Sequence, residues 1–393
     1  MSASPVPGLR ALVALVSAIV LCDTIFYAAI TPLLPTYADE HGIGKTGAGV
    51  LEAAYAAGTL AAAIPAGMLA VRMGVRATVL AGLALLGASS FAFGVADSIV
   101  VLDVARFMQG VGGACSWAGA LAWLVARAPV TRRGELIGTA MGAAIVGALL
   151  GPALGALAEG VGTAPVFSLA ALLAAVLAGI ALRVPAPASG GTADPRSIGR
   201  AARDARVLGG MALVSLPGAL FAAVGVLGPL RLDALGAGAP AIGVTFVLAS
   251  ALEAIASPVV GRISDRLGRL TPIRIGLLVA APLLLAIPHP EAAWAVAVLI
   301  ILAAPAIGAS WAPAMALLAD GIEARGVNVA LGFSLMNAAW GIGHVIGGAG
   351  GGGLGDALGD ALAFAVLAVL CLGVALVLVR AGSRRPRGQE ALA

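Results

Sequence analysis

The chain has few charged residues and few aromatic ones. Only 11% of its 393 residues are Asp, Glu, Lys or Arg and 4% are Phe, Trp or Tyr, whereas 61% are hydrophobic. A typical soluble domain carries roughly 25% charged residues, and so few charges do not cover so much apolar surface in water. The composition therefore predicts that lipid surrounds this chain.

Cysteine and lysine are scarce as well. The three cysteines, Cys22, Cys115 and Cys371, each lie inside an apolar run, which excludes a disulfide framework and a metal cluster. Lys45 is the one lysine among 23 basic residues. We interpret the net charge of +4 as arginine at membrane edges and not as a nucleic-acid surface. No residue pattern indicates a cofactor.

Apolar runs long enough to cross a bilayer, about 20 residues each, occur repeatedly. Most arginines flank them on one side, whereas acids dominate the other. The positive-inside rule then predicts a multi-pass protein of the inner (cytoplasmic) membrane with both termini in the cytoplasm. The first run lacks a small-x-small cleavage site, so we expect a retained span. The twelve predicted spans are residues 11–34, 47–70, 77–95, 99–126, 135–158, 164–182, 207–229, 241–261, 272–288, 293–318, 327–348 and 361–380.

One long polar segment separates six spans from six. Its start, rich in Pro, Ala and Gly, is typical of flexible linkers, and its Arg-rich end is typical of a membrane-surface segment. We therefore predict an N-terminal six-helix bundle over 1–183, a cytoplasmic linker over 184–206, and a C-terminal bundle with a short cytoplasmic tail over 207–393. Repeated halves of this kind are a transporter signature.

A short Gly- and Arg-rich stretch occurs once in each half. Glycine allows tight turns and close helix contact, and arginine holds a membrane edge. The two copies place Gly and Arg at matching offsets, which indicates a duplication. The first copy contains Gly67, Arg72, Gly74 and Arg76, and the second contains Gly261, Asp265, Arg266, Gly268 and Arg269.

Both stretches resemble the Gly-x-Leu-Ala-Asp-Arg-x-Gly-Arg-Lys loop of the major facilitator superfamily, and the resemblance extends over nearly the whole chain. It implies an all-α membrane protein of twelve transmembrane helices in two pseudo-symmetric six-helix bundles, with the two loops setting an inner gate. The second copy keeps the acid as Asp265, whereas Val71 replaces it in the first. We expect Asp265 to pair with Arg132 or Arg133 when the cytoplasmic side is closed.

The fifth predicted span resembles the antiporter motif of the same family. Its glycines recur every four residues and form one smooth stripe, which by resemblance admits a helix of the opposite half. A proline in this stripe favours a bend. The alternative is generic packing of small residues. The motif residues are Gly138, Gly147, Gly151, Pro152 and Gly155.

Spans one and four are similar to those of drug:proton antiporters, and the spacing Asp23-x8-Pro32-x2-Pro35 is similar to vesicular amine transporters. Counted along their helices at about 1.5 Å per residue, Asp23 and Arg106 lie at nearly the same depth. An unpaired charge there is costly, so each needs a partner, water or substrate. We predict that Asp23 carries a proton, binds a substrate cation, or does both, and that Arg106 and Gln109 organise the polar centre. The alternative is a purely structural pair.

Three further polar residues complete the predicted substrate and proton site. Glu52 shares a helix face with Tyr55 and Thr59, and Glu253 and Asn337 lie within spans eight and eleven. Each is a candidate for the cavity wall or, alternatively, for an interhelical hydrogen bond. We expect a structural role for His344, while Trp117 and Trp340 either stack on a ligand or pack ordinarily.

Two glycine-containing segments are set aside. Gly44-Lys45-Thr46 lacks the first glycine and the preceding strand of a phosphate loop, so ion gradients and not ATP are expected to supply energy. The run 347–355 holds seven glycines and predicts close packing and a loosened end of span eleven.

These observations predict proton-coupled export of a small drug-like or cationic compound by a monomer. The partners are the substrate, protons and the lipid bilayer, with no nucleic acid. A sugar or metabolite exporter and a proton symporter of the same fold are the alternatives within transport. A non-transporting sensor or scaffold is a further one. An enzyme is not expected, because no clustered His, Cys or nucleophile–base pair occurs in the spans.

Overall fold

The computed structural model describes residues 8–187, 199–201, 203–326 and 329–383. Within these residues the chain is built from helices and has no strand. The predicted linker lies mostly outside the described residues, as does the C-terminal tail beyond residue 383. The domain boundaries at 183 and 207 stay a prediction.

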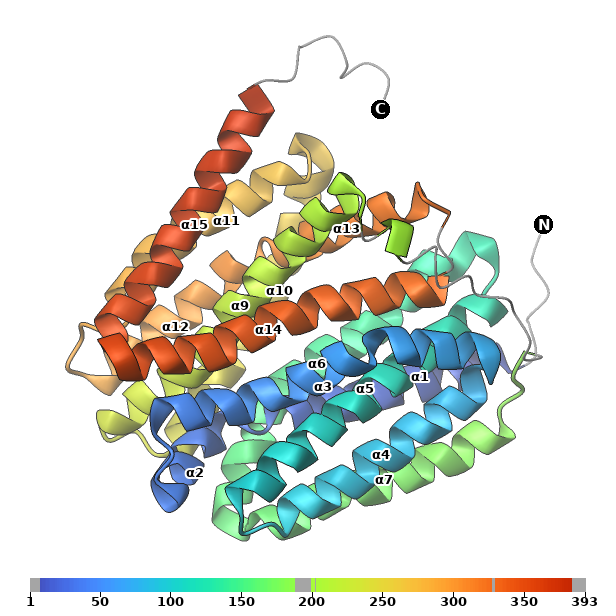
Figure 1. Ribbon diagram of the computed structural model, residues 1–393, viewed down its shortest axis with the longest axis horizontal. Coiled ribbons are helices and arrows are strands. Elements are labelled where there is room, and N and C mark those ends of the chain that lie inside the picture. The colour runs from blue at the N-terminus through green and yellow to red at the C-terminus, as the bar shows by residue number, and fades with distance from the viewer. Residues whose placement is uncertain (1–7, 188–198, 202, 327–328, 384–393) are drawn as a thin grey trace.

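The first half of the chain forms a bundle of long helices (Figure 1). The first span is α1 (Leu9–Ala28), continued by η1 (Thr31–Leu33) and α2 (Leu34–His41). The five further spans of this half are α3 (Gly44–Arg72), α4 (Val75–Gly94), α5 (Ile99–Arg127), α6 (Arg133–Val161), which follows the short η2 (Val130–Arg132), and α7 (Thr163–Arg183).

The second half repeats this arrangement. Its fourth span is divided into two helices, as the first span of the chain is. The elements are α9 (Ala205–Ala234), α10 (Ala239–Leu267), α11 (Leu270–Ala286), α12 (Ala293–Gly308) with α13 (Trp311–Glu323), α14 (Val329–Leu358) and α15 (Asp360–Ser383).

Proline explains the two divided spans. Pro32 has no N–H to donate to the carbonyl of Ala28, where α1 ends, and Pro313 has none for Ala309, just after α12. A proline ring also clashes with the carbonyl four residues earlier. The predictions of one continuous helix over 11–34 and over 293–318 are therefore wrong. Each segment nevertheless counts as one candidate membrane span.

Ten helical segments of the described chain are long and apolar enough to span a membrane by length and composition. Two further apolar helices complete the set: α11 has 17 residues, and α14 has 30 residues. With these two the count is twelve. Each half encloses its own cluster of buried apolar side chains, centred on residues such as Phe26 and Phe167 in one and Leu277 and Phe364 in the other.

The duplication predicted from the Gly- and Arg-rich stretches is visible at the ends of the bundles. Gly74 and Gly268 each take a positive φ, +92° and +84°, immediately before the next span begins or the loop turns into it. In each half an arginine follows this glycine and binds a backbone carbonyl at the last helix. Arg76 donates to the carbonyl of Val184, directly after α7, and Arg274 donates to that of Leu378 in α15. The halves therefore share one construction.

We name the two ends of the molecule by their charges. The arginine-rich end contains the C-termini of α3, α5 and α10, with Arg72, Arg127 and Arg266. The acidic end contains the turn from α14 to α15, with Asp356 and Asp360. The spans run between these two ends.

Helices α3 and α14 lie side by side and join the halves (Figure 1). A Cβ at Gly49 would lie 2.4 Å from the carbonyl oxygen of Gly348, and one at Gly347 would lie 2.0 Å from that of Ala219 on α9. The glycine run thus packs α14 closely between α3 and α9, as predicted. Its predicted loosening is wrong, because α14 stays helical to Leu358 with these close contacts on two sides.

A second large contact between the halves, α6 against α10, lies in the part nearer the acidic end. Gly243 packs against Pro152 and Ala156. Towards the arginine-rich end, a Cβ at Gly138 or Gly261 would meet no atom within 4 Å. These two helices therefore separate towards the arginine-rich end.

Candidate functional site

Asp23 lies in the middle of α1, with a side chain 3% exposed. Its Oδ2 accepts hydrogen bonds from the hydroxyl of Tyr55 and from Nε1 of Trp117, both at 2.8 Å. Its Oδ1 has no hydrogen-bond partner. Gly113 leaves room for this arrangement, because a Cβ there would lie 2.4 Å from the Tyr55 hydroxyl. Two neutral donors therefore hold one oxygen and leave the other free.

Arg106 is fully buried on α5. Its guanidinium donates to Oε1 of Gln109 at 3.0 Å and to the carbonyl of Tyr27 at 3.4 Å. The amide of Gln109 in turn donates to Ser90 Oγ at 3.0 Å. The predicted pair Arg106 and Gln109 thus forms one polar network that ties α5 to α1 and α4.

Glu52 on α3 is the carboxylate nearest to that guanidinium. Its Oε2 lies 3.9 Å from Arg106 NH2, and its Oε1 accepts a hydrogen bond from the Tyr27 hydroxyl at 3.3 Å. Among the described residues no ion pair involves Asp23. Asp23 and Arg106 share the site, as their depth predicts, but the ion pair of Arg106 is with Glu52, whose Oε2 accepts no hydrogen bond.

Aromatic rings of both halves cover these charges. Tyr27 and Tyr55 lie 4.8 Å apart by ring centroid, and Trp340 of α14 lies 5.5 Å and 6.1 Å from them. His344, one turn further on, packs 4.0 Å from Trp340. The guanidinium of Arg106 lies 5.7 Å and 5.1 Å from the two tyrosine rings. The site therefore lies where the two halves meet.

Glu253 and Asn337 stand apart from this network. Glu253 is partly exposed on α10, and its carboxyl lies against Gly308, where α12 ends. No hydrogen bond or ion pair of either side chain is present among the described residues. The structure brings together Asp23, Glu52, Arg106 and Gln109, but not these two.

The predicted gate residues take separate partners. Arg76 binds the Val184 carbonyl, and Arg269 forms an ion pair with Asp320 of the same half. Arg132 pairs with Glu135, 2.7 Å away. Asp265 is exposed and has no ion pair among the described residues. The predicted contact of Asp265 with Arg132 or Arg133 is absent here, in agreement with the separation of α6 from α10 at this end.

The glycine stripe of α6 does not admit a helix of the opposite half. Gly147, Gly151 and Gly155 face α1 of their own half, and a Cβ at Gly155 would lie 1.9 Å from the carbonyl oxygen of Ala29. That expectation is therefore wrong: the stripe seats the helix that carries Asp23, while Pro152 and Ala156 contact α10. Gly138 contacts neither.

Two groups of residues escaped the sequence analysis. Tyr27 and Ser90 complete the polar network, and the spacing of Tyr27 from Asp23, one helical turn, was the available signal. Lys45 and Thr46 were set aside, yet their backbone N–H groups donate to Asp356 at 3.1 Å and 2.6 Å. Lys45 Nζ also pairs with Asp360. No local pattern marks a contact between residues so far apart in the chain.

Known proteins resemble this chain in sequence and in fold. A sequence model described as Major Facilitator Superfamily matches residues 16–332. A comparison with curated proteins gives no match.

Three solved structures share the architecture. A POT family transporter in complex with a thioalcohol-conjugated peptide has TM-score 0.75 and 15% identity, covering 95% of this chain and 96% of its own. The nucleoside transporter NupG has TM-score 0.74 and 13% identity, covering 95% and 99%. A bacterial homolog of the human lysosomal transporter Spinster, inward-facing and unoccupied, has TM-score 0.70 and 14% identity, covering 97% and 96%.

At these identities the solved structures speak for the fold, and the sequence match speaks for the family. The match spans well over half of the chain, and the twelve spans in two repeated bundles agree with it. The chain therefore belongs to the Major Facilitator Superfamily and is a membrane transporter of the secondary type, not an enzyme.

Proposed function

We propose that this transporter exports a small lipophilic or cationic compound in exchange for protons, with Asp23 as the shared binding group. The observation that carries the proposal is the state of that carboxyl. It is buried between the halves, held by two neutral donors and left with one free oxygen, while the nearby arginine is balanced by Glu52.

A carboxylate in this position needs a positive partner or a proton, because an uncompensated charge inside a membrane is costly. A substrate cation and a proton are alternatives at one oxygen pair, so binding of one excludes the other. The rings of Tyr27, Tyr55, Trp117 and Trp340 supply faces on which a cation or a flat apolar group binds favourably. Competition at Asp23 is then the physical basis of exchange.

The direction of transport follows from the proposed orientation. With the arginine-rich end on the cytoplasmic side of the inner (cytoplasmic) membrane, the separation of α6 and α10 corresponds to a state open to the cytoplasm. Substrate would enter from that side, and protons from the acidic end. We propose that a monomer suffices, because the site is assembled from the two halves of one chain.

The solved relatives by themselves do not select a substrate. Their names mention a peptide conjugate and nucleosides, so one fold serves different cargo. A sugar or metabolite exporter, a symporter and a non-transporting scaffold remain the competing functions, and the test must separate them.

The experiment uses purified protein in proteoliposomes with an imposed pH gradient. Tetraphenylphosphonium is the cationic probe, and a neutral hexose is the comparison. We expect gradient-driven movement of the cation, lost in Asp23→Asn and kept in Asp97→Asn, which changes an exposed carboxylate outside the site. Movement of hexose alone would indicate a sugar exporter. Movement of the cation in the same direction as protons would indicate a symporter. Movement of neither compound would contradict transport of these classes.

A further inference from the structure

The face of α10 that carries no neighbour continues into two arginines. Four strongly exposed apolar residues occupy it, among them Ile255 at 72% and Val259 at 48% exposed. At 100° per residue, these side chains and those of Arg262 and Arg266 fall within an arc of about 60°. The apolar members of this stripe are Val244, Leu248, Ile255 and Val259.

This stripe lies on the opposite side of α10 from the helix that packs against it, α12. Glu253 is placed about 180° from Val244 by the same count, against α12. Gly243, which contacts α6, is likewise off the stripe. A long apolar face without a protein neighbour in a membrane protein contacts acyl chains. The two arginines therefore sit at the lipid boundary.

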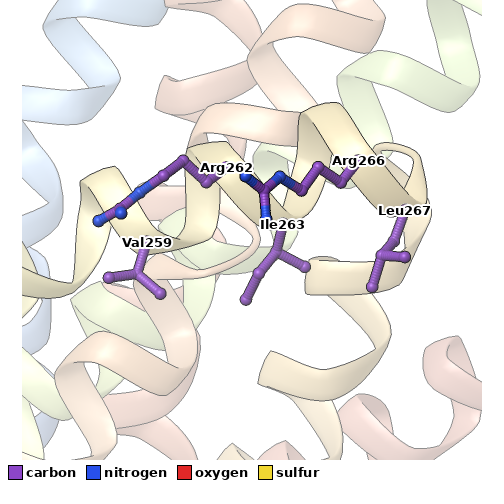
Figure 2. A pocket seen from close by; sticks show the side chains of 5 residues that line it. All are labelled: Val259, Arg262, Ile263, Arg266 and Leu267. Atoms are coloured by element: carbon purple, nitrogen blue, oxygen red, sulfur yellow. The ribbon is translucent and has the colours of Figure 1, made fainter.

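A pocket of about 470 Å³ marks the point where this stripe meets the arginine-rich end (Figure 2). Apolar side chains form most of its wall, and two guanidinium groups overlie it. It is lined by Val259, Arg262, Ile263, Arg266 and Leu267.

The arginines point towards the membrane. Figure 2 shows both side chains running back along the helix, away from Leu267, which is the usual direction of helical side chains. Nε of Arg262 donates to the carbonyl of Pro258 at 3.2 Å, which holds that side chain one turn nearer the membrane centre than its own Cα. The charges thus stay at the lipid boundary.

No carboxylate of the described chain neutralises either group. Arg269, by contrast, pairs with Asp320, and Arg132 with Glu135. Arg262 and Arg266 are both exposed, one turn apart, and have no ion pair among the described residues. Two adjacent guanidinium groups with free N–H donors match the geometry of a phosphate.

We propose that this pocket binds an anionic phospholipid of the leaflet at the arginine-rich end, with the phosphate between Arg262 and Arg266. One acyl chain lies over Val259 and Ile263 and follows the stripe towards Ile255. Ile255 lies about 10 Å from Arg262 along the helix axis. Charge complementarity selects the anionic headgroup, and the apolar wall selects a lipid over a free phosphate. The site goes beyond the proposed transport function, and its test does not require transport.

Native mass spectrometry of the detergent-purified full chain tests this site. Dioleoylphosphatidylglycerol is the probe, and dioleoylphosphatidylcholine is the neutral-headgroup comparison. We expect retention of the anionic lipid by the wild type to fall on the order of tenfold or more in Arg262→Gln/Arg266→Gln. Arg10→Gln/Arg183→Gln, which removes the same charge from the same end of the first half, should retain the lipid.

Two further arms separate the sources of an anion. Ile263→Asn should weaken the binding of dioleoylphosphatidylglycerol more than the binding of its short-chain dihexanoyl form. Inorganic phosphate should not displace the long-chain lipid from the wild type. Arg262→Lys/Arg266→Lys keeps both charges and should retain part of the binding. Equal loss in the two Gln double variants, or equal retention of both dioleoyl lipids by the wild type, would overturn the proposal.

Discussion

At the scale of single residues, the two carboxyls of the central site have different partners. Glu52 balances Arg106, and Asp23 is left to neutral donors. Sequence alone predicted that Asp23 and Arg106 lie at nearly the same depth, and it named Glu52 as a candidate for the cavity wall. It did not assign the partners, because three helices supply these groups and their rotation about their own axes is not fixed by a pattern that is apolar on nearly every side.

Tyr55→Phe removes one of the two donors to Asp23 without removing the ring. A hydrogen bond to a charged group contributes about 1.5–3 kcal/mol, so we expect affinity for the cationic probe to fall by about tenfold or more. Equilibrium binding of tetraphenylphosphonium to the purified protein measures this. Tyr37→Phe, also buried but outside the site, serves as the control, and equal affinities in the two variants would contradict the role of Tyr55.

Glu52→Gln tests the charge balance of the site. Removing one partner of a buried pair typically costs 3–5 kcal/mol, of the order of 3 here, because the other charge is left uncompensated. Thermal unfolding of the detergent-purified protein should show a clearly lower midpoint. Adding Arg106→Gln should recover part of the loss. A double variant that is less stable than the sum of both single changes would count against Glu52 as the counter-ion.

At the scale of helices, the predicted spans agree with the structure over most of their lengths, since long apolar runs bounded by arginine leave little choice. The exceptions follow from particular residues. The predictions ran through Pro32 and Pro313, where backbone donors are missing, and ended span eleven early at a glycine run that α14 uses for contact with α3 and α9. The partner of the α6 stripe was wrong because a smooth face does not specify which helix covers it.

Gly155→Ala tests that stripe. A Cβ at this position would lie 1.9 Å from the Ala29 carbonyl oxygen, so α1 must shift, and overpacking of this kind costs about 1–3 kcal/mol. Gly138→Ala in the same helix meets no atom within 4 Å and should be neutral or slightly stabilising, since alanine favours helix over glycine. Thermal unfolding compares the two. Equal effects of both changes would show that the stripe does not seat α1.

At the scale of the whole molecule, the contacts between the halves include a polar set at the acidic end. We call Lys45, Thr46, Asp356 and Asp360 the acidic-end clamp. The first N–H groups of a helix have no partner within it, and its N-terminus favours negative charge. Asp356 satisfies two such groups of α3, while Lys45 pairs with Asp360. The sequence predicted the duplication but not this clamp, whose members lie in different halves.

Asp356→Asn should weaken the clamp and favour opening at the acidic end. The carboxylate accepts two charge-assisted hydrogen bonds across the halves, each contributing about 1.5–3 kcal/mol, and the amide retains one acceptor oxygen. Loss of even one such bond shifts a two-state equilibrium by about tenfold or more. Spin labels on Glu40→Cys and Ala234→Cys, at the exposed acidic ends of α2 and α9, report the distance between the halves there.

The expected result is a longer or broader distance distribution in Asp356→Asn than in the labelled parent. Asp320→Asn provides the matched control, because it breaks the ion pair with Arg269 inside one half at the opposite end. If the clamp holds the halves together, only the first change moves the labels. If both changes or neither do, closure at this end rests on the α3–α14 and α6–α10 packing alone, whose glycines already bring the backbones into contact.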